Sequence, residues 1–337
     1  MGDECIDPLG GLADARAHRL RMPRKDAVRQ DPVRALRAAR FLAQLPRFTL
    51  DVEARRQATR SAAGLRRAAR ERIRVELDKL LGADAPLRGL EALDDLRLLD
   101  AVLPELGPLR SCRAGAGRPD VWRHTLDAID RASRPGRLPG GRAVREAGGR
   151  RLLGWALLLH DISKPETLAI REDGRPTFHG HESLGAERAE VLLSKLCMPR
   201  DERRRIGRLI RLHLRPSHLA DADAPDRGMR RLVREAGTDL PLLAVHSACD
   251  ALASGAPDAA RRWRRLRRVL TSLVKLWEDR RAISLPRLVD GRDVMRVLDV
   301  EPGQRIGDLL QRVREQQEEG KLTTRDEALA WLRARRS

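Results

Sequence analysis

The sequence predicts an all-α protein, and two observations carry that prediction. Apolar residues recur every three or four positions along almost the whole chain, which is the spacing of a helix that buries one face. The alternation of apolar and polar residues that marks a half-buried strand is essentially missing from the sequence. A length of 337 residues is enough for several helical domains with a sizeable buried core.

The apolar spacing predicts the main helices in chain order. We expect helices within residues 28–45, 73–81, 152–159, 263–277 and 325–334. The last of them opens with Thr324, three residues before Glu327, and this spacing is typical of a capping box.

Glycine and proline divide the chain between these helices. Residues 110–119 are rich in Gly and Arg and are typical of a linker. Residues 134–150 combine several Gly with two Pro, so we expect an exposed loop inside a helical domain. Residues 254–258 form a shorter break.

The charge balance points to a polyanionic partner. Lys and Arg number 68 against 49 Asp and Glu, which gives a net charge of +19 that must lie mostly on the surface. A GC-rich genome would explain Arg in place of Lys, but not the excess over acidic residues. With three Phe, five Trp and no Tyr, base-stacking platforms are disfavoured, so we expect contacts to phosphates and duplex shape.

Membrane and extracellular classes do not fit this sequence. It has no apolar run of 18 residues and no basic-then-apolar leader, so we expect neither a membrane span nor a secretory signal. The four Cys are scattered without a CxxC pair, which argues against disulfide and zinc-ribbon frameworks. These observations predict a cytoplasmic protein.

Histidine and aspartate gather in the middle of the chain in a pattern that a divalent metal ion could use. Six of the eight His lie between residues 124 and 218, and Asp250 follows on a later helix. The candidate ligands are His124, His160, Asp161, His181, His213 and Asp250. Imidazole and carboxylate suit Mg, Mn, Ni or Zn. The alternative for each His is a helix cap or a bond to a backbone carbonyl.

The adjacent His160 and Asp161 end an apolar run, so they should point into a buried pocket. A metal ion there could polarise a phosphoryl oxygen and activate a water molecule. Lys164, one turn later, could neutralise a phosphate. His160, Asp161 and Lys164 are therefore the candidate catalytic residues.

The ordered set H…HD…H…H…D resembles the HD superfamily of metal-dependent phosphohydrolases. Its stretches here are VWRHTLDAI, WALLLHDISKPET, FHGHESLGAERAEVLL, LIRLHLRP and HSACDALAS. The resemblance implies that His124, His160, Asp161 and Asp250 form the basic metal set, and that His181 and His213 serve a second metal or the phosphate. Ser163 replaces the usual Gly, and we expect little effect from that change.

A second candidate site lies on an early helix. In QDPVRALRAARF, Asp31 is expected as the N-cap and Pro32 as the first helical residue. Arg34, Arg37 and Arg40 recur every three residues, and such a row of guanidinium groups needs an anionic or hydrogen-bonding partner. The alternative is a capped surface helix with solvated arginines.

This helix, together with the preceding IDPLGGLAD segment, resembles the family of tRNA nucleotidyltransferases and poly(A) polymerases, class II. The resemblance implies that Asp31 and Arg34 pair with the base edge of CTP or ATP, with Arg37 and Arg40 as further nucleotide contacts. Gln30 stands where the family usually has Glu. The stretches LPRLVDGRDVM and TTRDEAL are similar to the family's tRNA-binding tail.

The resemblance implies an elongated neck, an HD domain and a helical tail. We expect a remnant of the nucleotidyltransferase head in 1–25, neck and nucleotide-recognition helices in 26–110, the HD domain in 118–255 and the tRNA-binding body and tail in 259–337. The family's chemistry needs a metal-binding DxD pair on a small mixed sheet, and none precedes Ile6. We therefore expect the catalytic head outside this chain, because the chain is truncated, a fragment, or paired with a separate head subunit.

Three functions remain open from the sequence. The first is a tRNA 3′-end maturation protein that binds tRNA and CTP or ATP and needs the missing head for transfer. The second is a metal-dependent HD phosphohydrolase acting on RNA ends or cyclic phosphates. The third is a non-catalytic tRNA-binding module.

Overall fold

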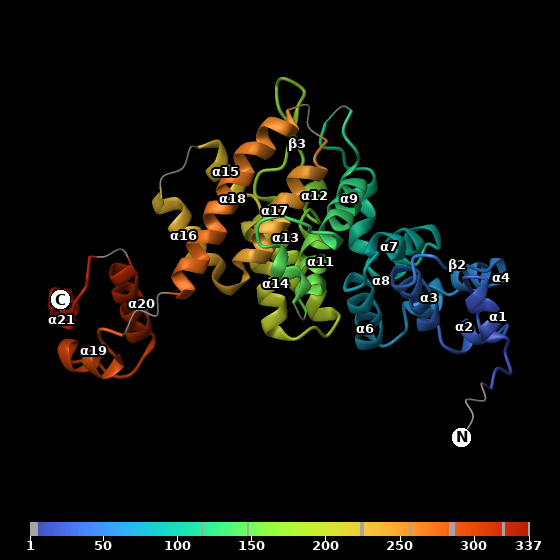
Figure 1. Ribbon diagram of the computed structural model, residues 1–337, viewed down its shortest axis with the longest axis horizontal. Helices are drawn as coiled ribbons and strands as arrows, with labels where there is room; N and C mark the ends of the chain where they lie inside the picture. Colours follow the sequence, from blue (N-terminus) through green and yellow to red (C-terminus); the bar gives the residue numbers. More distant parts are fainter. Residues whose placement is uncertain are drawn as a thin grey trace. The chain divides into compact units, whose positions relative to one another are not determined.

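The computed structural model describes residues 6–115, 117–146, 148–222, 226–255, 258–282, 287–318 and 321–335 (Figure 1). These residues are largely helical, which confirms the predicted all-α class. Within the same ranges the strands form two short two-stranded sheets, one parallel (β1 with β2) and one antiparallel (β3 with β4). No helix in this described part is long and apolar enough to cross a membrane.

The chain divides into two compact units, Met1–Trp277 and Glu278–Ser337. The sequence predicts the tRNA-binding body and tail in 259–337, and the boundary between the two compact units falls within that range, after Trp277. The reason is that Leu266, Leu270 and Leu273 are buried in the first unit's core.

The first part of unit 1 is a series of short helices around one parallel strand pair. Its elements are α1 (Gly11–Arg16), β1 (Arg19–Leu20), α2 (Ala27–Gln30), α3 (Val33–Gln44), β2 (Thr49–Leu50), α4 (Val52–Thr59), α5 (Ala62–Leu65), α6 (Arg70–Leu81), α7 (Pro86–Asp95), α8 (Leu99–Val102) and the 3-10 helix η1 (Pro104–Arg110). The expected helix of 28–45 is thus split into α2 and α3. Pro32, not Asp31, is the N-cap of α3, and Asp31 ends α2 with extended backbone.

The second part of unit 1 carries the longer helices. Its elements are α9 (Val121–Ser133), α10 (Gly141–Arg145), α11 (Gly149–Leu159), α12 (Lys164–Thr167), β3 (Ala169–Ile170), β4 (Pro176–Thr177), α13 (His181–Lys195), α14 (Arg200–Leu212), α15 (Arg215–Asp221), α16 (Asp226–Ala236), the 3-10 helix η2 (Gly237–Asp239), α17 (Leu240–Ala253) and α18 (Ala259–Ala282).

The segment 134–150 is more ordered than its glycine content suggests, because it contains α10. Gly140 caps this helix with φ of 82°, and a Cβ atom there would lie 2.2 Å from the carbonyl oxygen of Pro241. Glycine is therefore required by contact with α17 as well as by the backbone conformation.

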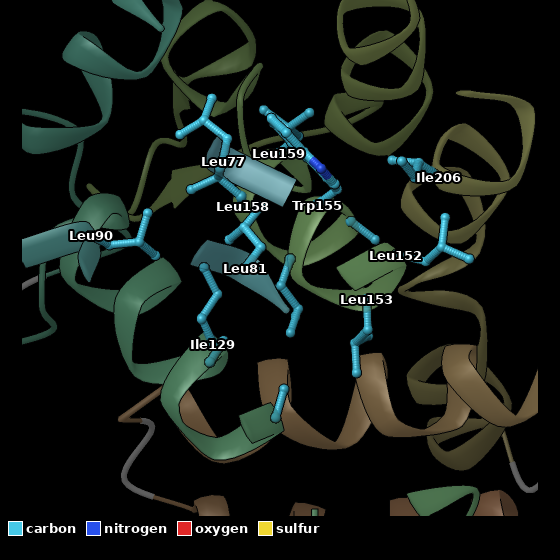
Figure 2. Packing of buried hydrophobic residues seen from close by; sticks show 14 of the residues in the cluster. Leu77, Leu81, Leu90, Ile129, Leu152, Leu153, Trp155, Leu158, Leu159 and Ile206 are labelled. Carbon is cyan, nitrogen blue, oxygen red and sulfur yellow. The ribbon is translucent and has the colours of Figure 1, made fainter. Parts of the chain in front are cut away.

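The core of unit 1 is built around α11, which is buried on every side (Figure 2). Its residues Leu152, Leu153, Trp155, Leu158 and Leu159 lie among side chains of four other helices. These neighbours are Leu77 and Leu81 of α6, Leu90 of α7, Ile129 of α9 and Ile206 of α14. A helix that is apolar all round belongs in such a position, and its far end is thereby fixed deep inside the unit.

Unit 2 has a small core of its own. Its helices are α19 (Gly291–Leu298), α20 (Gln304–Glu318) and α21 (Arg325–Arg333). Val294, Ala328 and Leu332 are among its fully buried residues. The predicted capping box is confirmed, since Thr324 and Glu327 each bond the other's backbone N–H at the start of α21.

Candidate functional site

Five elements of unit 1 bring the predicted imidazole and carboxylate groups to one place. His124 lies on α9, His160 is the residue at which α11 ends, and Asp161 follows it. His181 is the first residue of α13. His213 ends α14 and Asp250 lies on α17. We call these six residues the HD cluster.

The distances within the HD cluster are short enough for a shared ion. His124 Nε2 lies 2.9 Å from Asp250 Oδ1 and 3.7 Å from Asp161 Oδ2. His160 Nε2 lies 3.1 Å from Asp161 Oδ2 and 3.6 Å from Asp250 Oδ1. His181 Nε2 lies 3.4 Å from Asp161 Oδ1.

Three of the imidazole rings are oriented by the backbone immediately before them. Nδ1 of His160, His181 and His213 donates to the carbonyl oxygen three residues earlier, over 2.8, 2.7 and 2.7 Å. Because Nδ1 carries the proton in each bond, Nε2 is the atom left to face the cluster. The sequence left open that each His only bonds a backbone carbonyl. In these three residues that bond is present, and it orients the ring so that Nε2 faces the cluster.

Several inward-facing atoms of the cluster lack a well-aligned hydrogen bond among the described residues. They are His160 Nε2, His181 Nε2 and both carboxylate oxygens of Asp161. Each unsatisfied buried polar atom costs about 1–3 kcal/mol. These inward-facing atoms therefore point to a partner that they share, beyond the ion pair that Asp161 Oδ2 makes with Lys164.

The electrostatics of the cluster favour a positive charge. Burial would raise the pKa of Asp161, but the charges of His160 and Lys164 hold it well below its usual range. Burial would lower the pKa of His160, but Asp161 and Asp250 raise it to about 10. Burial lowers the pKa of His213 to about 3, so this ring is neutral. The carboxylates thus remain charged and attract a cation.

The donor set fits a divalent metal ion, as the resemblance found in the sequence implies. His124, His160 and Asp250 offer ligand atoms within 4.8 Å of one another, and so do His160, Asp161 and His213. Imidazole nitrogen and carboxylate oxygen are ligands that first-row divalent ions accept.

Lys164 lies at the edge of the cluster. Its Nζ is 2.6 Å from Asp161 Oδ2 and 5.4 Å from the centre of the Phe178 ring. The ammonium group is thus largely neutralised by Asp161 in this structure.

The structure adds one histidine that sequence reasoning missed. His246 is fully buried, and its ring centre lies 5.4 Å from those of both His160 and His213. It stands one helical turn before Asp250 on α17, a spacing that places both on the same side of the helix. The four-residue spacing between His246 and Asp250 is therefore the sequence signal that would have identified His246.

The second candidate site surrounds Asp31. Arg72 of α6 donates to Asp31 Oδ2 over 2.7 Å, and Arg34 Nε lies 3.9 Å from the same oxygen. Burial would raise the pKa of Asp31, but the hydrogen bond and charge of Arg72 lower it below its usual value. Asp31 Oδ1 is buried with no hydrogen-bond partner among the described residues. One carboxylate oxygen is therefore held, and the other is free to accept.

Arg37 and Arg40 have a different partner. Glu76 of α6 is 4% exposed. Its carboxylate accepts hydrogen bonds from Arg40 Nε over 2.7 Å and from Arg37 Nε over 3.4 Å. Arg40 also stacks over the Phe41 ring. The structure therefore divides the four predicted nucleotide-binding residues into an Asp31–Arg34 pair and an Arg37–Arg40 pair, and sequence reasoning missed both Arg72 and Glu76.

Two family models match the chain in the segments just described. Residues 47–109 match the probable RNA- and SrmB-binding site of polymerase A. Residues 121–253 match the HD domain, which contains the whole HD cluster.

Similarity to curated proteins extends over almost the entire chain. An A-adding tRNA nucleotidyltransferase of Deinococcus radiodurans is 34% identical over 98% of this chain and 74% of its own length. A CC-adding tRNA nucleotidyltransferase of Thermus thermophilus is 31% identical over 96% of this chain and 71% of its own length.

Solved structures share the fold. The Thermotoga maritima CCA-adding enzyme complexed with tRNA matches 98% of this chain and 68% of its own, with a TM-score of 0.54 and 16% identity. The Bacillus stearothermophilus CCA-adding enzyme with CTP gives the same coverage and TM-score at 22% identity.

Proposed function

Because this chain belongs to the tRNA nucleotidyltransferase family, we propose that it binds tRNA together with CTP or ATP in the maturation of tRNA 3′ ends. The observation that carries the proposal is 34% identity to an A-adding member over 98% of the chain. The net charge of +19 supports it, since tRNA is a polyanion. A role on tRNA also supports the cytoplasm as its compartment.

The Asp31 cluster is our candidate for reading the base. Asp31 Oδ1 would accept from the exocyclic amino group that cytosine and adenine share, and Arg34 would donate to the neighbouring ring nitrogen. Arg72 holds the other oxygen of Asp31 and so fixes the direction of the free one. Arg37 and Arg40, anchored by Glu76, would complete the wall of this site.

Nucleotide transfer itself would need a pair of metal-binding carboxylates on a strand. The strands that the structure describes carry no such pair. A head domain in a longer form of the chain or in a separate subunit would provide it. For these 337 residues, the proposal is therefore recognition of tRNA and nucleotide.

Titration calorimetry with each nucleoside triphosphate, alone and with tRNA lacking its last nucleotides, tests this proposal. We expect CTP or ATP to bind more tightly than UTP and GTP. Asp31→Ala should remove the preference, because a bidentate base contact discriminates by about 1–3 kcal/mol, or about 5- to 150-fold. Asp26→Ala is the matched control one turn away. Equal affinity for all four nucleotides in the unaltered chain would contradict the proposal.

A second activity is favoured by the buried atoms of His160, Asp161 and His181 that lack a well-aligned hydrogen bond. We propose that the HD cluster holds Mg, Mn, Ni or Zn through His124, His160, Asp161 and Asp250, with His181 and His213 beside them, and hydrolyses phosphate esters at RNA ends or cyclic phosphates. The bound ion would polarise the phosphoryl group and acidify a water molecule. Lys164 would supply positive charge for the phosphate once the ion takes over its pairing with Asp161.

Metal binding tests this second activity independently of tRNA. We expect calorimetry to detect a divalent ion, and Asp161→Asn to weaken it at least about tenfold, together with the loss of metal-dependent hydrolysis of a 2′,3′-cyclic phosphate. Asp173→Asn, which alters an exposed acid in the turn between β3 and β4, is the control. If Asp161→Asn binds metal as the unaltered chain does, the assignment of the ligands is wrong. The third possibility, a non-catalytic tRNA-binding module, predicts tRNA binding with neither metal nor nucleotide preference.

A further inference from the structure

Helix α18 carries an unusually one-sided charge. Between residues 259 and 277 it contains six Arg and one Lys and no acidic residue. Leu266, Leu270 and Leu273 are buried in the core of unit 1. The helix (Figure 1, orange) is therefore held by its apolar side, and its charges are left on the side away from the core.

The positions of the arginines follow from helical geometry. At about 100° per residue, Arg264, Arg265, Arg267 and Arg268 occupy an arc of about 160° opposite the buried leucines. All four side chains are exposed. Lys275 falls within the same arc, about 10 Å beyond Arg268 along the helix axis, and is also exposed. We call the four arginines the α18 arginine face.

These arginines have no ion pair or hydrogen-bond partner among the residues that the structure describes. Arg261 and Arg262, one turn earlier, share Asp258, and the next acidic residues on the helix are Glu278 and Asp279, about 15 Å beyond Arg268. Four adjacent guanidinium groups without a counter-charge repel one another. An arrangement of this kind is stabilised when a polyanion is bound.

Helix α14 shows that arginine content alone does not produce such a face. It also carries six Arg, but its first turn contains Asp201 and Glu202. Arg205 and Arg208 lie 2.6 and 3.6 Å from the buried Asp239. On α14 two of the six arginines thus face a buried acid and the helix carries two acids of its own, whereas the described residues place neither beside the four arginines of the α18 face.

We propose that the α18 arginine face binds the phosphate backbone of duplex RNA, and that it anchors tRNA to unit 1. The proposal rests on the proposed function for the identity of the RNA. A patch of guanidinium groups without aromatic side chains between them suits phosphates rather than unstacked bases. Because the face lies on the unit that contains the HD cluster, unit 1 itself would contact tRNA.

The test removes the charge and follows the salt dependence of tRNA binding. The variant R264Q/R265Q/R267Q/R268Q changes exposed positions only, so circular dichroism should show an unchanged fold. Each lost phosphate contact lowers the slope of log K against log salt by about 0.9, so four contacts lower it by about 3.6. Between about 50 and about 200 mM salt, the unaltered chain should therefore lose about 150-fold more affinity than the variant.

A matched control separates a defined surface from bulk charge. R137Q/R142Q/R145Q/R171Q removes the same charge from exposed positions elsewhere in unit 1, and its salt slope should stay within about one of the unaltered chain's. Equal losses in both variants, or no loss in the α18 variant while the unaltered chain binds tRNA, would overturn the inference and leave the proposed function standing. Failure of the unaltered chain to bind tRNA at any salt would overturn both.

A basic amphipathic helix can also attach to anionic lipid. Flotation with vesicles of equal parts phosphatidylcholine and phosphatidylserine tests that alternative. We expect tRNA to release the chain from such vesicles. Retention on vesicles in the presence of excess tRNA, lost in the α18 variant, would show that the face binds lipid and would refute the RNA assignment.

Discussion

The buried Glu76 carboxylate offers the sharpest test of how α3 and α6 are joined. Glu76 is 4% exposed and accepts from Arg40, whose side chain is 11% exposed, and from Arg37, whose side chain is 45% exposed. Glu76→Gln keeps the volume of the side chain but removes its charge, so that Arg40 remains buried beside a neutral amide.

The size of the effect follows from this burial. Removing one partner of a buried ion pair costs about 3–5 kcal/mol, and we take the lower end because Arg37 can turn to water. For a unit of this size, about 3 kcal/mol corresponds to a fall in melting temperature of about 5 °C.

Differential scanning calorimetry of the full chain measures this change. The control is Glu53→Gln, because the pair of Glu53 with Arg56 is 3.9 Å apart and both side chains are more than half exposed. That variant should lose no more than about 0.5 kcal/mol. If the melting temperature of Glu76→Gln falls no further than that of the control, the buried pair does not stabilise the junction and the reasoning is refuted.

Three further substitutions test other parts of the fold. Gly140→Ala should lower the free energy of unfolding in urea by at least about 2 kcal/mol, because it combines positive φ with a clash against Pro241. Gly148→Ala is the control, since Gly148 has a similar φ but open space around it, and it should cost about 1 kcal/mol. Equal costs for the two variants would contradict the contact with Pro241. Thr324→Ala should cost about 0.5–2 kcal/mol and speed hydrogen exchange at the start of α21, and unchanged exchange there would argue against the cap. Trp155→Phe removes the indole donor of a 2.7 Å hydrogen bond to a carboxylate and should cost about 1.5–3 kcal/mol; an unchanged urea midpoint would disprove that contribution.

Local pattern was enough to predict much of the HD cluster. Apolar spacing shows which face of a helix is buried, and His160 and Asp161 follow directly from an apolar run. The spacing within each motif therefore indicates residues that point inward. It does not indicate which inward side chains meet across helices, and for this reason His246 went unnoticed although it lies in one of the motif stretches.

The partners of the early arginines were beyond the same reasoning. Arg72 and Glu76 lie about 40 residues after the groups that they contact, and the packing of α6 against α3 brings them together. Charge pairing across such a distance depends on the turn between helices and on rotation about each axis. Neither quantity can be read from periodicity.

The way α11 and α14 end has a consequence for how their lengths can vary. Each helix finishes at a histidine, His160 or His213, whose ring is tied to the carbonyl three residues back. Inserting or deleting one residue within either helix would turn its terminal ring by about 100° and shift it by about 1.5 Å along the axis. Length changes are therefore tolerable in the β3–β4 hairpin or the connection before α10, but within these two helices a single-residue insertion would carry an imidazole out of the cluster.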